Sequence, residues 1–151
     1  MAERHVLIQR PPQAVWDVLS DGNLYSQWVV GTHDSKEADP AWPAEGANLR
    51  YSIRIGPTTL HNETVVRICE EPHTLELESK AGWLGTARIA IRVRRWATGS
   101  LVTLDEHPLS GPGARLHNSV IDAFLQLRHR SMLDRLAKVV ESRTPAPAKA
   151  P

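Results

Sequence analysis

The sequence predicts a single α+β domain in which a strongly curved, seven-stranded antiparallel sheet wraps around a long C-terminal helix. Three observations carry this prediction. The 151 residues suffice for one domain with a sizeable core. Apolar and polar residues alternate with a period of two through much of residues 48–107, as in strands with one buried face. From residue 114 to residue 142 the apolar residues instead recur every three to four positions, as in a helix.

The N-terminal segment predicts a strand followed directly by two short helices. The strand covers about residues 5–9. Pro11 and Pro12 then favour the first turn of a helix, where proline's missing N–H is no loss. The apolar residues that follow, Trp16 among them, have near-helical spacing. A second short helix is expected over residues 23–28.

Six further strands are expected, separated by turn signals such as Gly56-Pro57. They cover residues 29–38, 48–55, 59–69, 74–80, 84–95 and 101–107. Their alternation indicates one buried and one solvent-facing side, so a cover is needed on a single side of the sheet. The strand over residues 29–38 is an edge that could pair in a dimer, but the pattern leaves the oligomeric state open.

The cover is the helix expected over about residues 114–142, roughly 40 Å long at 1.5 Å per residue. Its apolar stripe consists of Val120, Ile121, Phe124, Leu125, Met132, Leu136, Val139 and Val140. The Pro/Ala-rich residues 144–151 cannot pack a core, so we predict a disordered tail after a domain of residues 1–143.

The charge balance argues against two classes of partner. Lys and Arg number 18 and Asp and Glu 17, so there is no net field to attract nucleic acid or an anionic membrane. The row Arg88, Arg92 and Arg94 has outward parity beside the strand that carries Glu76 and Glu78. We therefore expect cross-strand ion pairs there, and no nucleic-acid partner.

Cys69 is the single cysteine, which excludes an intramolecular disulfide and a cysteine zinc site; we expect a small buried side chain. The first residues lack the apolar run of a signal peptide, and no stretch approaches the ~20 apolar residues of a membrane span. The sequence thus predicts a cytoplasmic protein without stable membrane insertion.

Several polar residues share the inward parity of apolar neighbours. Asn62 and Thr64 alternate with apolar residues up to Ile68, and Ser79 and Glu106 lie on the inward side of their own strands. Such groups either orient a ligand or serve internal hydrogen bonds or the rim of the sheet. Glu106 and Asp122 could act as general acid or base with a pKa raised by burial, and Glu106 is the catalytic candidate.

Two more polar residues, Asn118 and Asp122, lie near the start of the long helix and close to its apolar stripe, with the same two alternatives.

Metal and cofactor motifs are not found. The histidines are His5, His33, His61, His73, His107, His117 and His129. None forms a ligand pair of known spacing, and there is neither a G-x-S-x-G turn nor a phosphate-binding loop. We expect no metal and no cofactor.

The tryptophans fall into two groups. Trp16 and Trp28, on the short helices, are expected in the core or in the wall of a cavity. Trp42, Trp83 and Trp96 lie in loops or at a strand end. They either mark a pocket mouth or a partner contact, or plug one end of the sheet.

Four segments resemble one family. They are PPQAVWDVLSDGNLYSQWVVG (residues 11–31), EEPHTLELES (70–79), GSLVTLDEHPLSGPG (99–113) and LRHRSMLDRLAKVVE (127–141). They look like the opening helices, the middle hairpin, the last strand with its exit loop, and the end of the long helix in the START-like superfamily. That superfamily is also called SRPBCC, or polyketide cyclase/dehydrase and lipid-transport proteins. The order of the predicted elements matches that superfamily as well. The resemblance covers about residues 3–142 and implies the helix-grip (START-like/Bet v 1-like) fold.

The resemblance implies a cavity between the sheet and the long helix that holds a small hydrophobic, lipid-like, aromatic or polyketide-like ligand. The residues then expected to contact the ligand are Trp28, Tyr51, Ile53, Asn62, Thr64, Leu77, Ser79, Ile89, Ile91, Leu104, Glu106, Asn118, Ile121, Asp122 and Leu125. Three functions stay open: a carrier or sensor, a polyketide cyclase or dehydratase that uses the same cavity, and a protein-interaction module.

Overall fold

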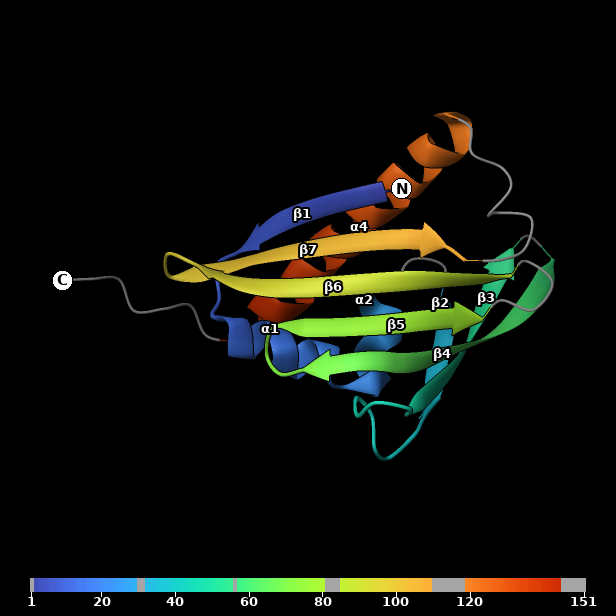
Figure 1. The fold of residues 1–151 in the computed structure, drawn as a ribbon, viewed down its shortest axis with the longest axis horizontal. Helices are drawn as coiled ribbons and strands as arrows, with labels where there is room; N and C mark the ends of the chain where they lie inside the picture. The colour runs from blue at the N-terminus through green and yellow to red at the C-terminus, as the bar shows by residue number, and fades with distance from the viewer. Residues whose placement is uncertain (1, 30–31, 56, 81–84, 110–118, 145–151) are drawn as a thin grey trace.

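The computed structural model describes residues 2–29, 32–55, 57–80, 85–109 and 119–144. In chain order its elements are β1 (Ala2–Ile8), α1 (Pro12–Leu19), the 3-10 helix η1 (Gly22–Leu24), α2 (Tyr25–Trp28), β2 (Thr32–Ala38), β3 (Asn48–Ile55), β4 (Thr58–Glu70), β5 (Thr74–Lys80), β6 (Thr86–Trp96), β7 (Gly99–Pro108) and α4 (Ser119–Arg143). The described strands form one antiparallel sheet of seven strands in the order β1-β7-β6-β5-β4-β3-β2 (Figure 1).

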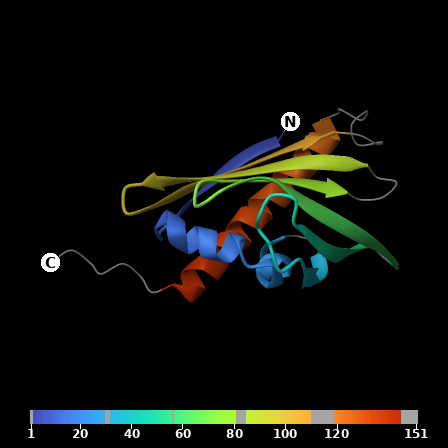
Figure 2. The same cartoon turned by 60° about the horizontal axis from the view of Figure 1, so that its bottom comes forward.

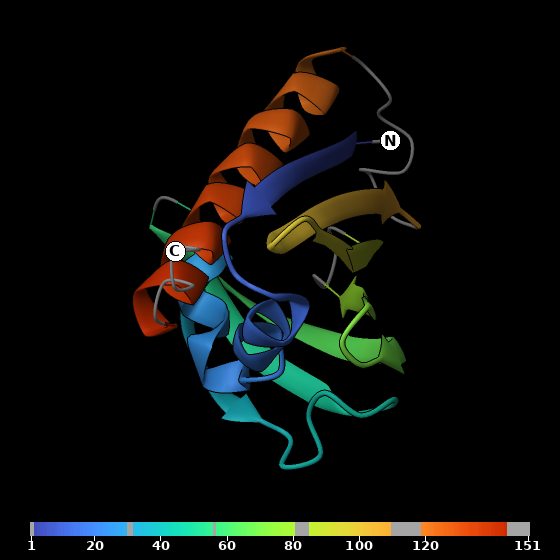
Figure 3. The same ribbon diagram turned by 90° about the vertical axis from the view of Figure 1, so that its left-hand side faces the viewer.

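The helices lie together on one side of the sheet, which curves around them (Figures 2 and 3). Helix α4 packs along β1 and also contacts β7, α1 and α2. Helix α1 reaches β6 and β7, and α2 lies against β2. The predicted α+β helix-grip arrangement is confirmed.

One side of α4 enters the core. Met132, Leu133, Leu136 and Val140 are buried and join the same hydrophobic cluster as Leu104 of β7. Their spacing of one, three and four positions keeps them on one face of the helix. Each fully buried aliphatic side chain contributes about 1.5–3 kcal/mol, so this stripe holds α4 against the sheet.

Local interactions set the helix ends near the N-terminus. Helix α1 begins at Pro12, as proline in a first turn predicts. The Asp21 carboxylate accepts the backbone N–H of Asn23 at 3.0 Å and caps η1. The backbone N–H of Val29 donates to the carbonyl of Tyr25 at 3.0 Å, which ties Val29 to α2. Among the described residues, strand β2 begins at Thr32, against the predicted residue 29.

A β-bulge in β4 corrects one predicted parity. Val66 pairs with Leu77, and Ile68 pairs with Glu76, so Arg67 is an extra residue on β4. The alternation reverses at that point. Ile68, expected inward, lies instead on the outer side with Glu76, and it is Cys69 that shares the inner side with Leu75.

The C-terminal end of α4 is tied to the N-terminal segment. Arg10 donates from Nε to the carbonyl of Thr144 at 3.0 Å and from Nη2 to the carbonyl of Glu141 at 3.2 Å. These carbonyls have no partner within a helix, so a cation suits the position. The helix starts at Ser119 among the described residues, against residue 114 predicted, and the rest of the predicted tail lies outside the described residues.

Candidate functional site

The inner face of the sheet has an aliphatic floor made by residues predicted as ligand contacts. Leu77 of β5 pairs with Ile89 of β6, and Ile91 of β6 pairs with Leu104 of β7. All four side chains are buried in the main hydrophobic cluster. Because paired residues of neighbouring strands project to the same side, they form two adjacent rows across the sheet. This surface would offer a ligand only apolar contact.

A cluster of hydroxyl and amide groups lies at one end of that floor. The Tyr51 hydroxyl is 3.0 Å from Ser79 Oγ and accepts from Thr64 Oγ1 at 3.3 Å and from Asn62 Nδ2 at 3.5 Å. The register explains the cluster, since Tyr51 pairs with Asn62 and Thr64 pairs with Ser79. The structure thus brings together four of the residues that the sequence singled out.

The hydrogen-bond roles in the Tyr51 cluster leave a donor and an acceptor. With Asn62 and Thr64 donating to its oxygen, the Tyr51 O–H is directed to Ser79, and the Ser79 O–H becomes a donor for another group. Asn62 Oδ1 is buried without a hydrogen-bond partner among the described residues. The Tyr51–Ser79 contact at 3.0 Å is at the upper end of the range of O–H···O bonds, and the Thr64 contact at 3.3 Å is longer.

Aromatic rings connect the Tyr51 cluster to the short helices. The Tyr25 ring of α2 lies 5.1 Å from the Tyr51 ring and 5.3 Å from the Trp28 ring, in tilted and edge-to-face arrangements. Trp28 is 3% exposed, and its Nε1–H has no hydrogen-bond partner among the described residues. Trp28, a predicted ligand contact, therefore adds a buried N–H donor on α2 to the Ser79 hydroxyl donor on the sheet.

A buried acid–imidazole pair lies on β7 and α4. Glu106 is 7% exposed and His129 is 0% exposed. Glu106 Oε1 lies 3.6 Å from His129 Nε2, which is beyond hydrogen-bond distance but within ion-pair distance. Both ring nitrogens of His129 lack a hydrogen-bond partner in the described part of the chain. Glu106, the predicted acid or base, thus faces a second titratable group.

The two polar sites are separate. Ser79 pairs with Ala87, which pairs with Pro108, two residues along β7 from Glu106. Two strand spacings and two residues place the Cα atoms of Ser79 and Glu106 roughly 12 Å apart. The inner face therefore offers polar groups at two places, and Ile89, which pairs with both Leu77 and Glu106, lies between them.

Sequence reasoning missed His129 and Tyr25. His129 continues the apolar stripe of α4, three residues before Met132, and that position was the available signal. Tyr25 precedes Trp28 by one helical turn, but the helix is too short to give a period.

Some predicted contacts are not tested. Asn118 lies outside the described residues. Ile53 belongs to β3, and Ile121, Asp122 and Leu125 belong to α4. The structure describes the backbone of these four residues but not their side chains. Their contact with a ligand stays a prediction.

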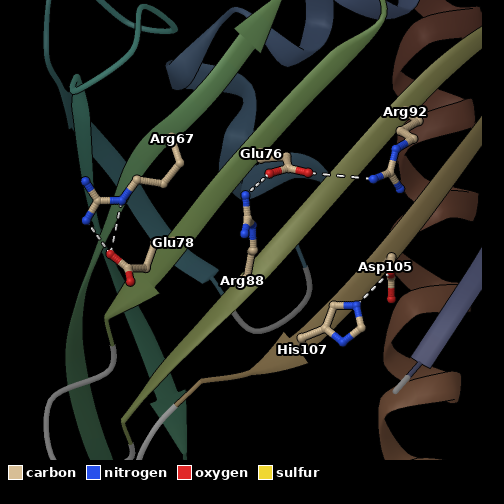
Figure 4. A network of polar contacts seen from close by, with 7 residues as sticks. All are labelled: Arg67, Glu76, Glu78, Arg88, Arg92, Asp105 and His107. Carbon is tan, nitrogen blue, oxygen red and sulfur yellow. Dashed lines mark hydrogen bonds and ion pairs between the residues drawn. The ribbon is translucent and has the colours of Figure 1, made fainter.

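The outer face carries a network of ion pairs, drawn in Figure 4. Arg88 contacts Glu76, Arg92 Nη2 lies 3.6 Å from Glu76 Oε1, and Arg67 contacts Glu78. The prediction of cross-strand ion pairs is confirmed for Arg88 and Arg92.

Further contacts complete that network. His107 Nε2 lies 2.9 Å from Asp105 Oδ2. The hydrogen bond from Arg67 lowers the pKa of Glu78. Each arginine drawn in Figure 4 thus contacts a carboxylate on this face.

Cys69 packs against the core but is only partly buried, whereas a buried side chain was expected. Burial, together with the nearby charges of Glu71 and Glu45, raises the pKa of its thiol. Within the described residues, no three His, Cys, Asp or Glu side chains gather as a metal site would require. No described helix is long and apolar enough to cross a membrane.

The structure separates the loop tryptophans. Trp42 is 9% exposed, and its Nε1–H donates to the carbonyl of Leu19 at 3.4 Å. It plugs the end of the fold beside Tyr25, with the ring centroids 6.5 Å apart, so it does not offer a partner contact. Trp96 is 56% exposed at the end of β6, and Trp83 lies outside the described residues.

Fold and inner face together define a helix-grip α+β protein with an aliphatic interior and a few buried polar groups. The chain belongs to the family described as polyketide cyclase / dehydrase and lipid transport, whose model matches residues 2–141. The resemblance inferred from the sequence is confirmed.

Solved structures share the fold at low identity. DynU16, a protein of the dynemicin biosynthetic locus, is similar with a TM-score of 0.69 and 20% identity, over 97% of this chain and 49% of its own. The chain therefore spans about half the length of DynU16. Ara h 8.0201 gives a TM-score of 0.72 at 11% identity, over 93% of this chain and 96% of its own.

A protein from Rhodobacter sphaeroides gives a TM-score of 0.71 at 17% identity, over 93% of this chain and 91% of its own. Identities this low show the fold alone. A search of curated proteins finds no match.

Proposed function

We propose that this protein binds a small, largely apolar molecule between the inner face of the sheet and α4. Its ligand would be lipid-like, aromatic or polyketide-like, as membership of the family suggests. The aliphatic floor of Leu77, Ile89, Ile91 and Leu104 would supply the contact area.

One observation carries the proposal. Asn62 Oδ1, Trp28 Nε1 and the ring nitrogens of His129 are buried without hydrogen-bond partners among the described residues, and Asp105 Oδ1 on the outer face shares this state. An unpaired buried polar group costs about 1–3 kcal/mol, and native proteins pair the great majority of them. The three residues come from β4, α2 and α4, the elements that would enclose the ligand. Polar atoms of a ligand would satisfy these groups, whereas a purely structural core would pair them internally.

Native mass spectrometry of the gently purified protein tests the proposal. We expect a fraction of molecules to carry an added mass of small-molecule size, and 1-anilinonaphthalene-8-sulfonate to bind with about one site per chain. A protein that carries no added mass and binds no apolar dye contradicts the proposal.

The matched control uses the outer face. Asn62→Leu should weaken dye binding, because it removes the amide of the Tyr51 cluster at one end of the aliphatic floor. Ser52→Ala, which removes the hydroxyl that lies 3.3 Å from His61 Nδ1, should leave dye binding as in the wild type.

A cyclase or dehydratase using the same space is the second candidate, favoured by the Glu106–His129 pair. Aldol cyclisation with dehydration needs a base to remove a proton from carbon next to a carbonyl and an acid to protonate the departing hydroxyl. A carboxyl and an imidazole 3.6 Å apart can supply both. Glu106→Gln should then lower turnover of a poly-β-ketone substrate at least about tenfold. Unchanged turnover would remove Glu106 from the mechanism.

A further inference from the structure

The Glu106–His129 pair has a geometry that a third atom would complete. The 3.6 Å between Glu106 Oε1 and His129 Nε2 is too long for a direct hydrogen bond. An oxygen atom about 2.8 Å from each of them would bridge the two groups by hydrogen bonds. His129 is fully buried, and its ring nitrogens have no hydrogen-bond partner among the described residues.

Hydrogen-bond roles restrict what the third atom can be. A carboxylate only accepts, and an imidazole protonated at Nε2 donates from that atom. The bridging group must then donate to Glu106 and accept from His129. A hydroxyl does both, an ether or carbonyl oxygen cannot donate, and an ammonium group cannot accept.

We propose that the Glu106–His129 pair recognises a hydroxyl group of the ligand, so that the ligand class is a hydroxylated aromatic or enolic molecule. This inference rests on the proposed internal binding and names the chemistry that binding selects. The hydroxyl donates to Glu106 Oε1 and accepts from His129 Nε2. Its carbon skeleton lies on the floor that Ile89 and Leu104 help to form, because Ile89 pairs with Glu106 across β6 and β7.

The Tyr51 cluster extends the same prediction. The Cα atom of Ser79 in this cluster lies roughly 12 Å from that of Glu106. The cluster offers the Ser79 hydroxyl and Asn62 Oδ1 to a second polar group. A ligand that reaches both sites has polar atoms at its two ends and an apolar middle.

Three naphthalene probes of similar size test the hydroxyl assignment by equilibrium dialysis. They are 2-naphthol, 2-methoxynaphthalene and the cationic 2-(aminomethyl)naphthalene. We expect the Kd of 2-naphthol to be about tenfold lower than that of either other probe, the range of one hydrogen bond to a charged group.

Variants locate the selectivity. The double variant Glu106→Leu/His129→Phe replaces both polar side chains by apolar ones of similar volume, and it should bind 2-naphthol and 2-methoxynaphthalene equally. Glu106→Gln keeps an acceptor and should keep part of the preference. Asp105→Asn, on the outer face of the same strand, is the matched control and should keep all of it. Circular dichroism and thermal unfolding confirm that each variant is folded.

The outcomes separate this inference from the proposed function. Binding of all three probes with equal affinity leaves internal binding intact and overturns the hydroxyl assignment. A preference for 2-naphthol that survives in the folded Glu106→Leu/His129→Phe variant also overturns the hydroxyl assignment. So does a preference that is lost only in Asn62→Leu/Ser79→Ala, a variant of the Tyr51 cluster. Tighter binding of the cationic probe would assign Glu106 to cations instead. Binding of no probe contradicts the proposed function itself.

Discussion

The outer and inner faces of the sheet differ in how their polar side chains are satisfied. On the outer face, Glu76 and Glu78 each contact an arginine, and Asp105 contacts His107 through Oδ2 while its Oδ1 has no hydrogen-bond partner among the described residues. On the inner side, Asn62 and His129 keep polar atoms without hydrogen-bond partners among the described residues. Ion pairs at a wet surface contribute little each, whereas a buried unpaired group is costly. The difference fits the proposal that the outer face serves the fold and the inner face serves a ligand.

The largest effect is expected at the Glu106–His129 pair. His129→Phe alone should lower the free energy of unfolding by about 3 kcal/mol, because it removes a partner from a buried carboxylate. The double variant Glu106→Leu/His129→Phe should return to within about 1 kcal/mol of wild type or exceed it, since well-packed apolar pairs often replace buried polar pairs without loss. Urea unfolding at pH 7 measures both. Equal losses in the single and double variants would show that the pair is not coupled.

A second test concerns the hub of the inner polar cluster. Tyr51→Phe should destabilise the protein by about 1–3 kcal/mol, because Thr64 and Ser79 lose the shared hydroxyl while the aromatic packing on Tyr25 remains. Ser52→Ala, on the opposite face of β3, should change stability by no more than about 0.5 kcal/mol. Thermal and urea unfolding compare the two variants. If they are equal, the faces do not differ as described.

The fold was largely predictable because its signals are local. Strands β3 and β5 match their predicted bounds, since alternation and flanking turn residues occur within each segment. The bulge at Arg67 was not predictable, because an extra residue on one strand depends on pairing with the next and leaves no local mark.

The candidate site was predictable only in part. Parity identified the inward polar residues Asn62, Thr64, Ser79 and Glu106, which lie in strand segments without a bulge. It could not identify their partners. His129 meets Glu106 only through the packing of α4 on the sheet, a long-range contact that no spacing in the sequence encodes.

A smaller effect is expected on the outer face at Glu76. Arg88→Met leaves this nearly buried carboxylate with Arg92 at 3.6 Å and should cost about 1 kcal/mol. Arg88→Lys keeps the charge but not the planar donor group and should cost less. A loss above about 3 kcal/mol in urea unfolding would mean that the outer network is as critical as the inner face.

The smallest effect concerns Arg67 and its dependence on pH. Its hydrogen bond lowers the pKa of Glu78, so the pair stabilises the folded state above the ordinary carboxyl pKa, about 4.3. This contribution is lost as the pH falls through the lowered pKa of the folded state. Arg67→Met should therefore cost less than about 1 kcal/mol at pH 7 and nearly nothing well below pH 4. A difference that persists unchanged at low pH would exclude the ion pair as its cause.

The contrast between the two faces is tested most directly by the indole N–H signals in a proton–nitrogen correlation spectrum during titration with 2-naphthol. Trp28 Nε1 is buried without a hydrogen-bond partner among the described residues, and Trp96 is exposed at the end of β6. Assignment by Trp28→Phe and Trp96→Phe identifies the two signals. We predict a saturable shift of the Trp28 signal and an unchanged Trp96 signal. A shift at Trp96 with none at Trp28 would contradict the account, because binding would then lie outside the grip of the sheet on α4.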